Sequence, residues 1–237
     1  MVRVAIVEDD VVQGDTLEQW FADQGCDVHL FRGSRDFVRM AGRESFDLAL
    51  VDWMLPEMSG HEVLRWLRED RGNDMPVIFI TARDAEEDIA QALNAGADDY
   101  LVKPVRKLEL MSRIEAVMRR ARPHARSQKI EIAQYCFELQ SKRVTMAGEP
   151  VELTDKEFEL AVFLFRNLGR LLSRGHMLEA VWGQTANLAT RTVDTHVSRV
   201  RSKLNLRPDN GFRLVPTYNF GYRLERLSGE QTEREPA

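Results

Sequence analysis

Apolar residues within positions 1–120 form short continuous runs that alternate with longer amphipathic stretches. Runs of this length without polar alternation are typical of strands that are buried on both faces. They cover Val2–Val7, Asp47–Asp52, Val77–Thr81 and Tyr100–Val102. A fifth candidate strand, Cys26–Phe31, shows the pattern less clearly. Between them, Val11–Gln24 and Gly60–Arg68 repeat apolar residues at helical spacing. Repeated strand–helix units predict an α/β fold with a doubly wound, five-stranded parallel sheet.

The pattern changes after residue 128, where shorter, partly alternating runs are separated by turn residues. Such runs predict a small antiparallel sheet. They cover Lys129–Ala133, Tyr135–Leu139, Arg143–Met146 and Pro150–Leu153. Three helical stretches follow at about 155–167, 174–182 and 190–204, and then a hairpin near Arg213–Leu224. This half of the chain is therefore expected to be an α+β domain.

These patterns divide the chain into a first domain at 1–120, a linker at 121–128 and a second domain at 129–226. The linker is polar and basic, and Pro123 interrupts it. Residues 227–237 are polar, and we expect them to form a disordered tail.

The two predicted domains differ in net charge, although the whole chain carries a net charge of −5. Residues 1–122 hold 24 acidic and 16 basic residues, a net charge of −8, whereas residues 123–226 hold 16 basic and 11 acidic residues, a net charge of +5. This asymmetry favours a polyanionic partner for the second domain. No apolar run approaches the roughly 18 residues of a membrane helix. The two cysteines, Cys26 and Cys136, lack metal-ligand spacing, so we expect a cytoplasmic protein without membrane contact.

Five polar side chains fall where the predicted parallel strands end. Glu8 and Asp9 follow the first strand, Asp52 ends the third, Thr81 ends the fourth and Lys103 follows the last. Because the ends of parallel strands share one edge of a sheet, these side chains are expected to converge. Three clustered carboxylates repel one another unless a cation neutralises them, and oxygen ligands favour Mg²⁺. A carboxylate beside Mg²⁺ can attack phosphorus and become an acyl phosphate, so we predict a phosphoryl-accepting site.

Four segments contain these residues or lie beside them: Val7–Asp10, Val51–Pro56, Ile80–Arg83 and Gly96–Pro104. In order and sequence they resemble the receiver domain of two-component response regulators, which has a flavodoxin-like fold. The resemblance implies that Asp52 is the phosphoacceptor and that Mg²⁺ is held by Glu8, Asp9, Asp52 and the main-chain carbonyl of Met54. It also implies that Thr81 and Lys103 sense the phosphoryl group and that Tyr100 is a switch aromatic that turns inward. The aromatic residue that the family usually carries after Lys-Pro is Val105 here.

The stretch Arg191–Leu204 has two distinct faces when it is plotted as a helix. One face is apolar, with Val193, Val197, Val200 and Leu204. The opposite face carries Arg191, Thr195, Ser198, Arg199 and Ser202. Arginine and small hydroxyls opposite a docking face suit a helix that enters the major groove of DNA. An ordinary amphipathic surface helix would show the same pattern.

This stretch belongs to a set of five segments: Leu153–Leu160, Gly169–Arg174, Val181–Gly183, Arg191–Leu204 and Gly221–Leu224. In the first of them, Thr154 and Glu157 have the spacing of a capping box. Together the segments resemble the winged-helix effector domain of OmpR/PhoB-type regulators. By position, the resemblance implies that DNA phosphates and the groove edges are met by Arg191, Thr192, His196 and Arg201, with support from Tyr222. It makes Arg199 the residue for base readout, with Thr195 and Ser198 beside it.

Two features depart from that family. Pro216 and Tyr218 stand where the wing usually carries a threonine and an arginine. A tyrosine cannot supply the cation that a narrow minor groove attracts, so we expect Tyr218 to act as a hydrogen-bond partner. The loop at 183–189, where relatives often meet RNA polymerase, is small and uncharged.

The resemblance also implies a sensor histidine kinase as phosphoryl donor and double-stranded DNA as target. Phosphorylation would promote a homodimer through the fourth helix, fifth strand and fifth helix. The residues expected at this interface are Asp98, Asp99, Glu109 and Arg113. Asp99 and Arg113 match a usual pair of the family, whereas Ile89 replaces the basic partner of Glu109.

Two other functions fit parts of the pattern. An aspartate-dependent phosphatase usually needs a second acid two residues after its nucleophile, and that position holds Met54. A DNA-binding protein with a vestigial receiver fits Ile89 and Val105, but not the complete set of strand-end residues. We therefore predict a transcriptional response regulator that turns over no separate substrate.

Overall fold

The structure, a computed structural model, describes residues 2–71, 73–121, 128–183 and 191–227. The chain divides into two compact units, Met1–Ala121 and Arg122–Ala237. The predictions for 122–127 of the linker, for 184–189 of the loop and for 228–237 of the tail lie outside the described residues. None of the helices in the described part of the chain is long and apolar enough to span a membrane.

The first unit contains the predicted five-stranded parallel sheet, with strand order β2-β1-β3-β4-β5. The strands are β1 (Arg3–Val7), β2 (Asp27–Phe31), β3 (Leu48–Val51), β4 (Val77–Thr81) and β5 (Asp99–Val102). Strands β1, β3 and β4 are buried along their whole length, as the continuous apolar runs predict. The doubly wound α/β fold is therefore confirmed.

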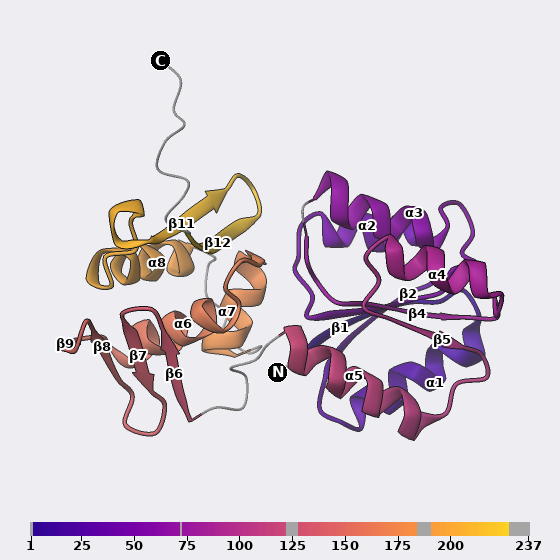
Figure 1. Ribbon diagram of the computed structural model, residues 1–237, viewed down its shortest axis with the longest axis horizontal. Helices are drawn as coiled ribbons and strands as arrows, with labels where there is room; N and C mark the ends of the chain where they lie inside the picture. The colour runs from indigo at the N-terminus through magenta and orange to yellow at the C-terminus, as the bar shows by residue number, and fades with distance from the viewer. Residues whose placement is uncertain (1, 72, 122–127, 184–190, 228–237) are drawn as a thin grey trace, which may run out of the picture. The chain divides into compact units, whose positions relative to one another are not determined.

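Helices cover both faces of this sheet (Figure 1). Helices α1 (Val11–Ala22) and α5 (Lys107–Ala121) pack on one face, around a buried cluster that includes Leu17, Phe21 and Leu110. Helices α2 (Ser34–Ala41), α3 (Gly60–Arg65) and α4 (Glu86–Asn94) pack on the other, around Phe37, Phe46 and Leu64. Helix α5 extends one residue beyond the predicted end of the domain.

The predicted helix at Gly60–Arg68 is interrupted, because α3 gives way to a π-helical turn at Trp66–Asp70. Apolar spacing does not distinguish the two kinds of turn. Arg68 lies in this turn, and its Nη1 donates to the carbonyls of Asn73 at 2.7 Å and Met75 at 2.9 Å. Its Nη2 donates to the carbonyl of Gly96 at 2.8 Å. Arg68 therefore connects the turn to the segments before β4 and β5.

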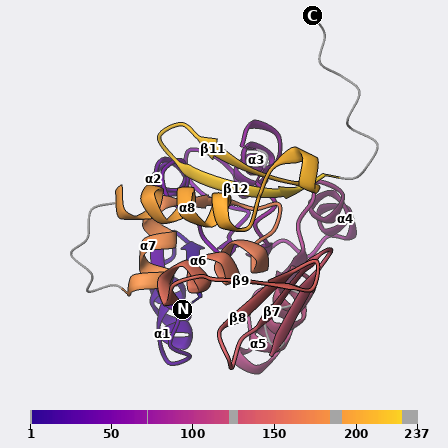
Figure 2. The same ribbon diagram turned by 90° about the vertical axis from the view of Figure 1, so that its left-hand side faces the viewer.

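The second unit begins with the predicted antiparallel sheet, whose strand order is β6-β7-β8-β9. The strands are β6 (Lys129–Ile132), β7 (Tyr135–Glu138), β8 (Arg143–Met146) and β9 (Glu149–Val151). The helices are α6 (Asp155–Arg166), α7 (Arg174–Trp182) and α8 (Arg191–Lys203). A 3₁₀ turn at Pro208–Asn210 precedes the predicted hairpin of β11 (Phe212–Thr217) and β12 (Gly221–Arg226). In Figures 1 and 2 the three helices lie between the four-stranded sheet and this hairpin.

One strand was not predicted. β10 (Leu171–Ser173) pairs with β12, so the hairpin belongs to a three-stranded sheet with the order β10-β12-β11. Its three residues are too few to show any period, and only their pairing with β12 makes them a strand. With this addition, the predicted α+β winged-helix domain is confirmed.

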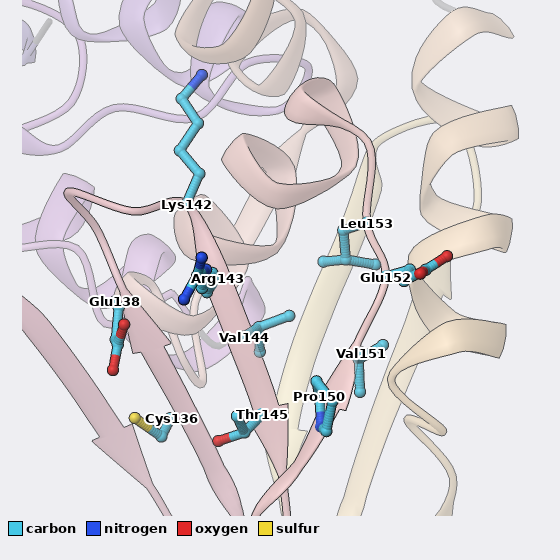
Figure 3. A pocket seen from close by; sticks show the side chains of 10 residues that line it. All are labelled: Cys136, Glu138, Lys142, Arg143, Val144, Thr145, Pro150, Val151, Glu152 and Leu153. Carbon is cyan, nitrogen blue, oxygen red and sulfur yellow. The ribbon is translucent and has the colours of Figure 1, made fainter.

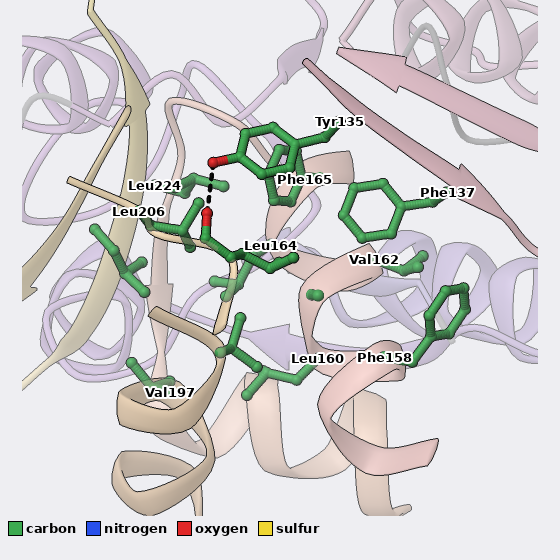
Figure 4. Packing of buried hydrophobic residues seen from close by; sticks show 14 of the residues in the cluster. Tyr135, Phe137, Phe158, Leu160, Val162, Leu164, Phe165, Val197, Leu206 and Leu224 are labelled. Atoms are coloured by element: carbon green, nitrogen blue, oxygen red, sulfur yellow. Dashed lines mark hydrogen bonds between the residues drawn. The ribbon is translucent and has the colours of Figure 1, made fainter. Parts of the chain in front are cut away.

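A single core joins the sheets and helices of the second unit (Figure 4). Tyr135 of β7 packs edge-on against Phe165 of α6, and its hydroxyl donates to the carbonyl of Leu204 at 2.6 Å. The predicted capping box at the start of α6 is present, because the amide of Thr154 donates to Glu157 at 2.9 Å and the amide of Glu157 donates to the Thr154 hydroxyl. Lys203 of α8 donates to the buried Glu157 at 2.7 Å, so the cap also fixes the end of α8.

Candidate functional site

The acidic side chains at the strand ends of the first unit converge as their order along the chain predicts. Glu8 and Asp9 follow β1, Asp52 follows β3, and one carboxylate oxygen of each lies within 4.8 Å of the others. Glu8 and Asp52 are buried, whereas Asp9 is exposed. Three hard oxygen donors open to water on one side suit Mg²⁺, which keeps part of its hydration shell. The donor set therefore fits the predicted cation.

Lys103 supplies the compensating charge at this cluster. Its Nζ donates to Asp52 Oδ2 at 2.6 Å and lies 3.0 Å from Glu8 Oε2. Burial raises the pKa of Glu8, and the ammonium of Lys103 offsets only part of this shift. Burial alone would lower the pKa of Lys103, but the hydrogen bonds and charges of Asp52 and Glu8 together raise it. The cluster therefore favours a cation, and the lysine stays charged.

Met54 and the predicted switch residues lie next to this cluster in the fold. The amide of Met54 donates to Asp52 Oδ1 at 2.9 Å, while the role of its carbonyl stays a prediction. Thr81 is buried at the end of β4, and its Oγ1 accepts from the amide of Arg83 at 3.4 Å. Tyr100 is turned inward, and its hydroxyl donates to the carbonyl of Arg83 at 2.9 Å. Both switch residues therefore contact the main chain of Arg83, whose guanidinium lies over the ring of Trp53.

The residues predicted for a dimer interface pair within their own chain. Arg113 of α5 donates to Asp99 at 3.3 Å and to Glu109 at 3.0 Å. Asp98 accepts from Arg68 at 3.3 Å and from the amide of Val77 at 2.9 Å. Burial lowers the pKa of Arg68 and raises that of Asp98, so these two groups depend on each other's charge. Ile89, which stands where a basic residue was expected, packs against the buried cluster around Phe37 and Leu64.

Helix α8 shows the predicted two faces. The apolar residues Val193, Val197, Val200 and Leu204 are buried in the core. The exposed residues of the other face are Arg191, Thr195, Ser198, Arg199 and Ser202. The exposed face therefore presents two guanidiniums and three hydroxyls.

Several of the predicted DNA-facing residues also make contacts inside the domain. Arg201 donates to the carbonyl of Leu214 in β11 at 2.8 Å. The Nδ1 of His196 lies 2.8 Å from the carbonyl of Thr192, and its ring packs edge-on against Trp182. The hydroxyl of Tyr222 donates to Asp194 at 2.7 Å, and this tyrosine is only 7% exposed. Their roles at DNA stay predictions, and the contacts show that they also position α8.

Sequence reasoning missed Arg174 and Asp194. The Nε of Arg174 donates to Asp194 Oδ1 at 2.8 Å, the oxygen that Tyr222 also contacts. The Arg174 guanidinium lies 5.0 Å from the centre of the Tyr222 ring. These contacts join the starts of α7 and α8 to β12. The only signal in the sequence is an acidic residue on a helix expected to meet DNA, and a solvated side chain explains it equally well.

The turn between β11 and β12 forms the tip of the wing. Tyr218 lies there and is 90% exposed, and Asn219 beside it has a φ of 53°. Asparagine tolerates this left-handed conformation better than most residues. The side chain offered at the wing tip is therefore a phenol rather than a cation.

A groove of about 600 Å³ lies on the four-stranded sheet of the second unit (Figure 3). It is lined by residues of β7, β8 and β9 and of the segment that follows β9, among them Cys136, Glu138 and Thr145. None of the predicted site residues lines it. Within the second unit it is therefore separate from the exposed face of α8.

Both halves of the chain match known families. Residues 4–115 match the response regulator receiver domain, and residues 148–224 match the C-terminal domain of transcriptional regulatory proteins. The sensory transduction protein RegX3 of Mycolicibacterium smegmatis is 38% identical over 229 residues, which cover 95% of this chain and 100% of that protein. The phosphate regulon transcriptional regulatory protein PhoB of Rhizobium meliloti is 37% identical over 86% of this chain and 90% of its own. Among solved structures, the response regulator DrrB of Thermotoga maritima, described as an OmpR/PhoB homologue, is 27% identical with a TM-score of 0.45, covering 96% of this chain and 100% of its own.

A receiver domain joined to a DNA-binding domain defines a two-component response regulator that acts in transcription. Within that class, the chain belongs to the OmpR/PhoB family of response regulators.

Proposed function

We propose that Asp52 accepts a phosphoryl group from a sensor histidine kinase in a Mg²⁺-dependent reaction, and that this promotes dimerisation and sequence-specific binding to double-stranded DNA. The convergence of Glu8, Asp9, Asp52 and Lys103 is the observation that carries the proposal. The relatives named as transcriptional regulators support it. We propose RNA polymerase as a further partner of the second unit.

The side chains at the site can divide the work of phosphoryl transfer. A carboxylate oxygen of Asp52 attacks phosphorus, the bond from phosphorus to the kinase histidine breaks, and that imidazole keeps the electron pair and gains a proton. Glu8, Asp9 and Asp52 would hold Mg²⁺, which when bound offsets the charge of the phosphoryl oxygens. Lys103, now 2.6 Å from Asp52, would then neutralise a phosphoryl oxygen. The hydroxyl of Thr81 would donate to another.

Coupling to the second unit would begin at Arg83. Thr81 and Tyr100 both contact its main chain, so a movement of Thr81 toward a phosphoryl group changes the support of the Tyr100 hydroxyl. Such a shift biases a two-state surface formed by α4, β5 and α5. We propose that the biased surface pairs with a second copy and so brings two α8 helices to adjacent half-sites.

Labelling with acetyl phosphate tests the phosphoryl site. Wild-type protein is expected to gain the mass of one phosphoryl group when Mg²⁺ is present and none without it, because the carboxylate cluster needs the cation. Asp52→Asn is expected to gain nothing. Asp10→Asn is the matched control, because asparagine can also cap α1 and Asp10 is not among the proposed ligands. Intact mass spectrometry measures all three, and equal labelling of Asp52→Asn and wild type would refute the proposal.

Two arginines of α8 are expected to act differently on DNA. Arg199→Ala should weaken specific binding about 10–100-fold and relax sequence preference, because a bidentate contact to guanine contributes about 1–3 kcal/mol. Arg191→Ala should weaken specific and random DNA alike and reduce the salt slope by about one, as expected for a phosphate contact. Both residues are exposed, Arg191 at the start of α8 and Arg199 about two turns further along it. Fluorescence anisotropy across a salt series measures both effects, and the assignment is wrong if the two variants behave alike.

A further inference from the structure

A glycine in the first half of α1 is unexplained by the fold alone. Gly14 lies inside the helix, where glycine costs about 1 kcal/mol relative to alanine. It is buried, and its amide makes an ordinary helical hydrogen bond to the carbonyl of Asp10 at 2.9 Å. The backbone conformation therefore does not explain why position 14 has no side chain.

The space that a side chain at position 14 would fill is held by Arg32, which follows β2. A Cβ atom on Gly14 would lie 2.2 Å from Nη1 of Arg32 and 3.2 Å from Cδ1 of Leu30. The guanidinium therefore lies directly against the backbone of α1. Because it is the far end of a flexible side chain, a methyl group at position 14 would displace it at little cost to the fold.

From this position Arg32 holds the segment that carries two of the three clustered acids. Its Nη1 donates to the carbonyl of Asp10 at 2.9 Å and reaches that of Glu8 at 3.5 Å. The end of β2 also holds this segment through its backbone, because the amide of Glu8 donates to the carbonyl of Phe31 at 3.0 Å. Glu8 and Asp10, on either side of Asp9, are thus attached to the end of β2 by main-chain and side-chain contacts.

The ion pair of Arg32 with Asp15 does not account for the glycine. Nη2 of Arg32 contacts the Asp15 carboxylate, but these side chains are 38% and 61% exposed. An exposed ion pair contributes about 0–1 kcal/mol, which does not exceed the cost of glycine in a helix. The contacts of Arg32 that remain to account for Gly14 are those with the main chain of the acidic segment Glu8–Asp10.

We propose that Arg32 is a positioning residue for the Mg²⁺ site, that it acts by fixing the main chain of Glu8–Asp10, and that Gly14 is required to admit it. The inference rests on the proposed Mg²⁺ site at Glu8, Asp9 and Asp52. Mg²⁺ demands near-ideal octahedral geometry, so a segment free to shift binds it less well. Groups that orient metal ligands from outside the first coordination sphere commonly change metal affinity severalfold or more.

The charge of Arg32 complicates a simple deletion. A guanidinium beside the site repels Mg²⁺, so Arg32→Ala removes a repulsion together with the positioning contacts. Gly14→Ala keeps the charge in the protein and displaces the guanidinium from its position against α1. The informative comparison is therefore between two effects of Gly14→Ala on Mg²⁺ affinity, one measured with Arg32 present and one with Arg32 replaced by alanine.

The experiment is calorimetric titration of the full-length chain with MgCl₂, for wild type, Gly14→Ala, Arg32→Ala and the double variant. Gly14→Ala is expected to raise the dissociation constant about 3–10-fold in the wild-type background, the equivalent of one or two lost hydrogen bonds. In the Arg32→Ala background the same change should leave the dissociation constant unaltered. There it should also raise the melting temperature, because alanine is the better helix former.

Three results would overturn the inference. An equal loss of affinity in both backgrounds would assign the effect of Gly14→Ala to contact with Leu30 or the backbone. No loss in either background would show that the position of Arg32 does not matter to the cation. Wild-type protein that binds no Mg²⁺ would refute the proposed function together with this inference, whereas the first two results leave the proposed function standing.

Discussion

Replacing Gly221 with alanine is expected to destabilise the second unit by about 3 kcal/mol, which lowers its melting temperature by roughly 10–20 °C. Gly221 begins β12, between Ser173 of β10 and Thr217 of β11. A Cβ atom there would lie 1.9 Å from the carbonyl oxygen of Leu172 and 2.9 Å from its carbon. These are backbone atoms of a paired strand, so no side chain can turn aside to relieve the contact. The sheet has to separate at β10, and DNA binding through the wing should be lost with it.

Gly148→Ala is the control for Gly221→Ala, because it lies in the same unit and poses a different problem. Gly148 has a φ of +86°, but a Cβ atom there would have no neighbour within 4 Å. Its substitution should cost only the strain of a left-handed residue, about 1–2 kcal/mol. Calorimetry of the full-length chain compares the two, and similar losses would mean that the short approach to Leu172 is relieved in solution.

Arg68→Ala is expected to destabilise the first unit by about 2–4 kcal/mol. The arginine donates to the carbonyls of Asn73, Met75 and Gly96 and pairs with Asp98. Its removal leaves those carbonyls short of a donor and a half-buried carboxylate short of its cation. Partly buried groups that lose their partners cost about 1–3 kcal/mol each, and water restores some of this loss at the surface.

Arg65→Ala provides the comparison for Arg68, since it removes an exposed arginine three residues earlier on α3. A surface substitution of this kind is expected to stay within about 0.5 kcal/mol. Urea unfolding followed by circular dichroism measures the free energy of unfolding of both variants. If Arg68→Ala is no worse than Arg65→Ala, the contacts of Arg68 contribute no net stability.

The strands of the first unit could be predicted closely because a short, continuous apolar run is stable mainly as a strand buried on both faces of a sheet. Val77–Thr81 was predicted to the residue, and Asp99–Val102 to within one. The acidic cluster followed from topology, because parallel strands bring Glu8 and Asp52 to one edge whatever lies between them. The two faces of α8 could be predicted because the helical period alone places its apolar and polar residues on opposite sides.

The contacts made by Arg32, Arg68 and Arg174 could not be predicted. Each guanidinium binds main-chain carbonyls or a carboxylate that only the tertiary fold brings near, and a charged residue in the sequence looks the same whether it is solvated or engaged. Gly14 is a weak signal of a close contact, because glycine is unfavourable inside a helix and usually has a packing reason there. The partner of that glycine was visible only once β2 and α1 were placed together.

The ion pairs on α5 and β5 bear on how two receivers could associate. Asp99 and Glu109 already pair with Arg113, and Asp98 with Arg68, inside their own chain. Pairing with a second copy would exchange these partners rather than add new ones, so the exchange of ion pairs yields little net free energy. The driving force for association would then fall to the exposed apolar side chains of α4, β5 and α5, which include Leu93, Val102 and Leu108. Association of that kind responds weakly to salt and strengthens on warming, the reverse of what a charge-driven interface would do.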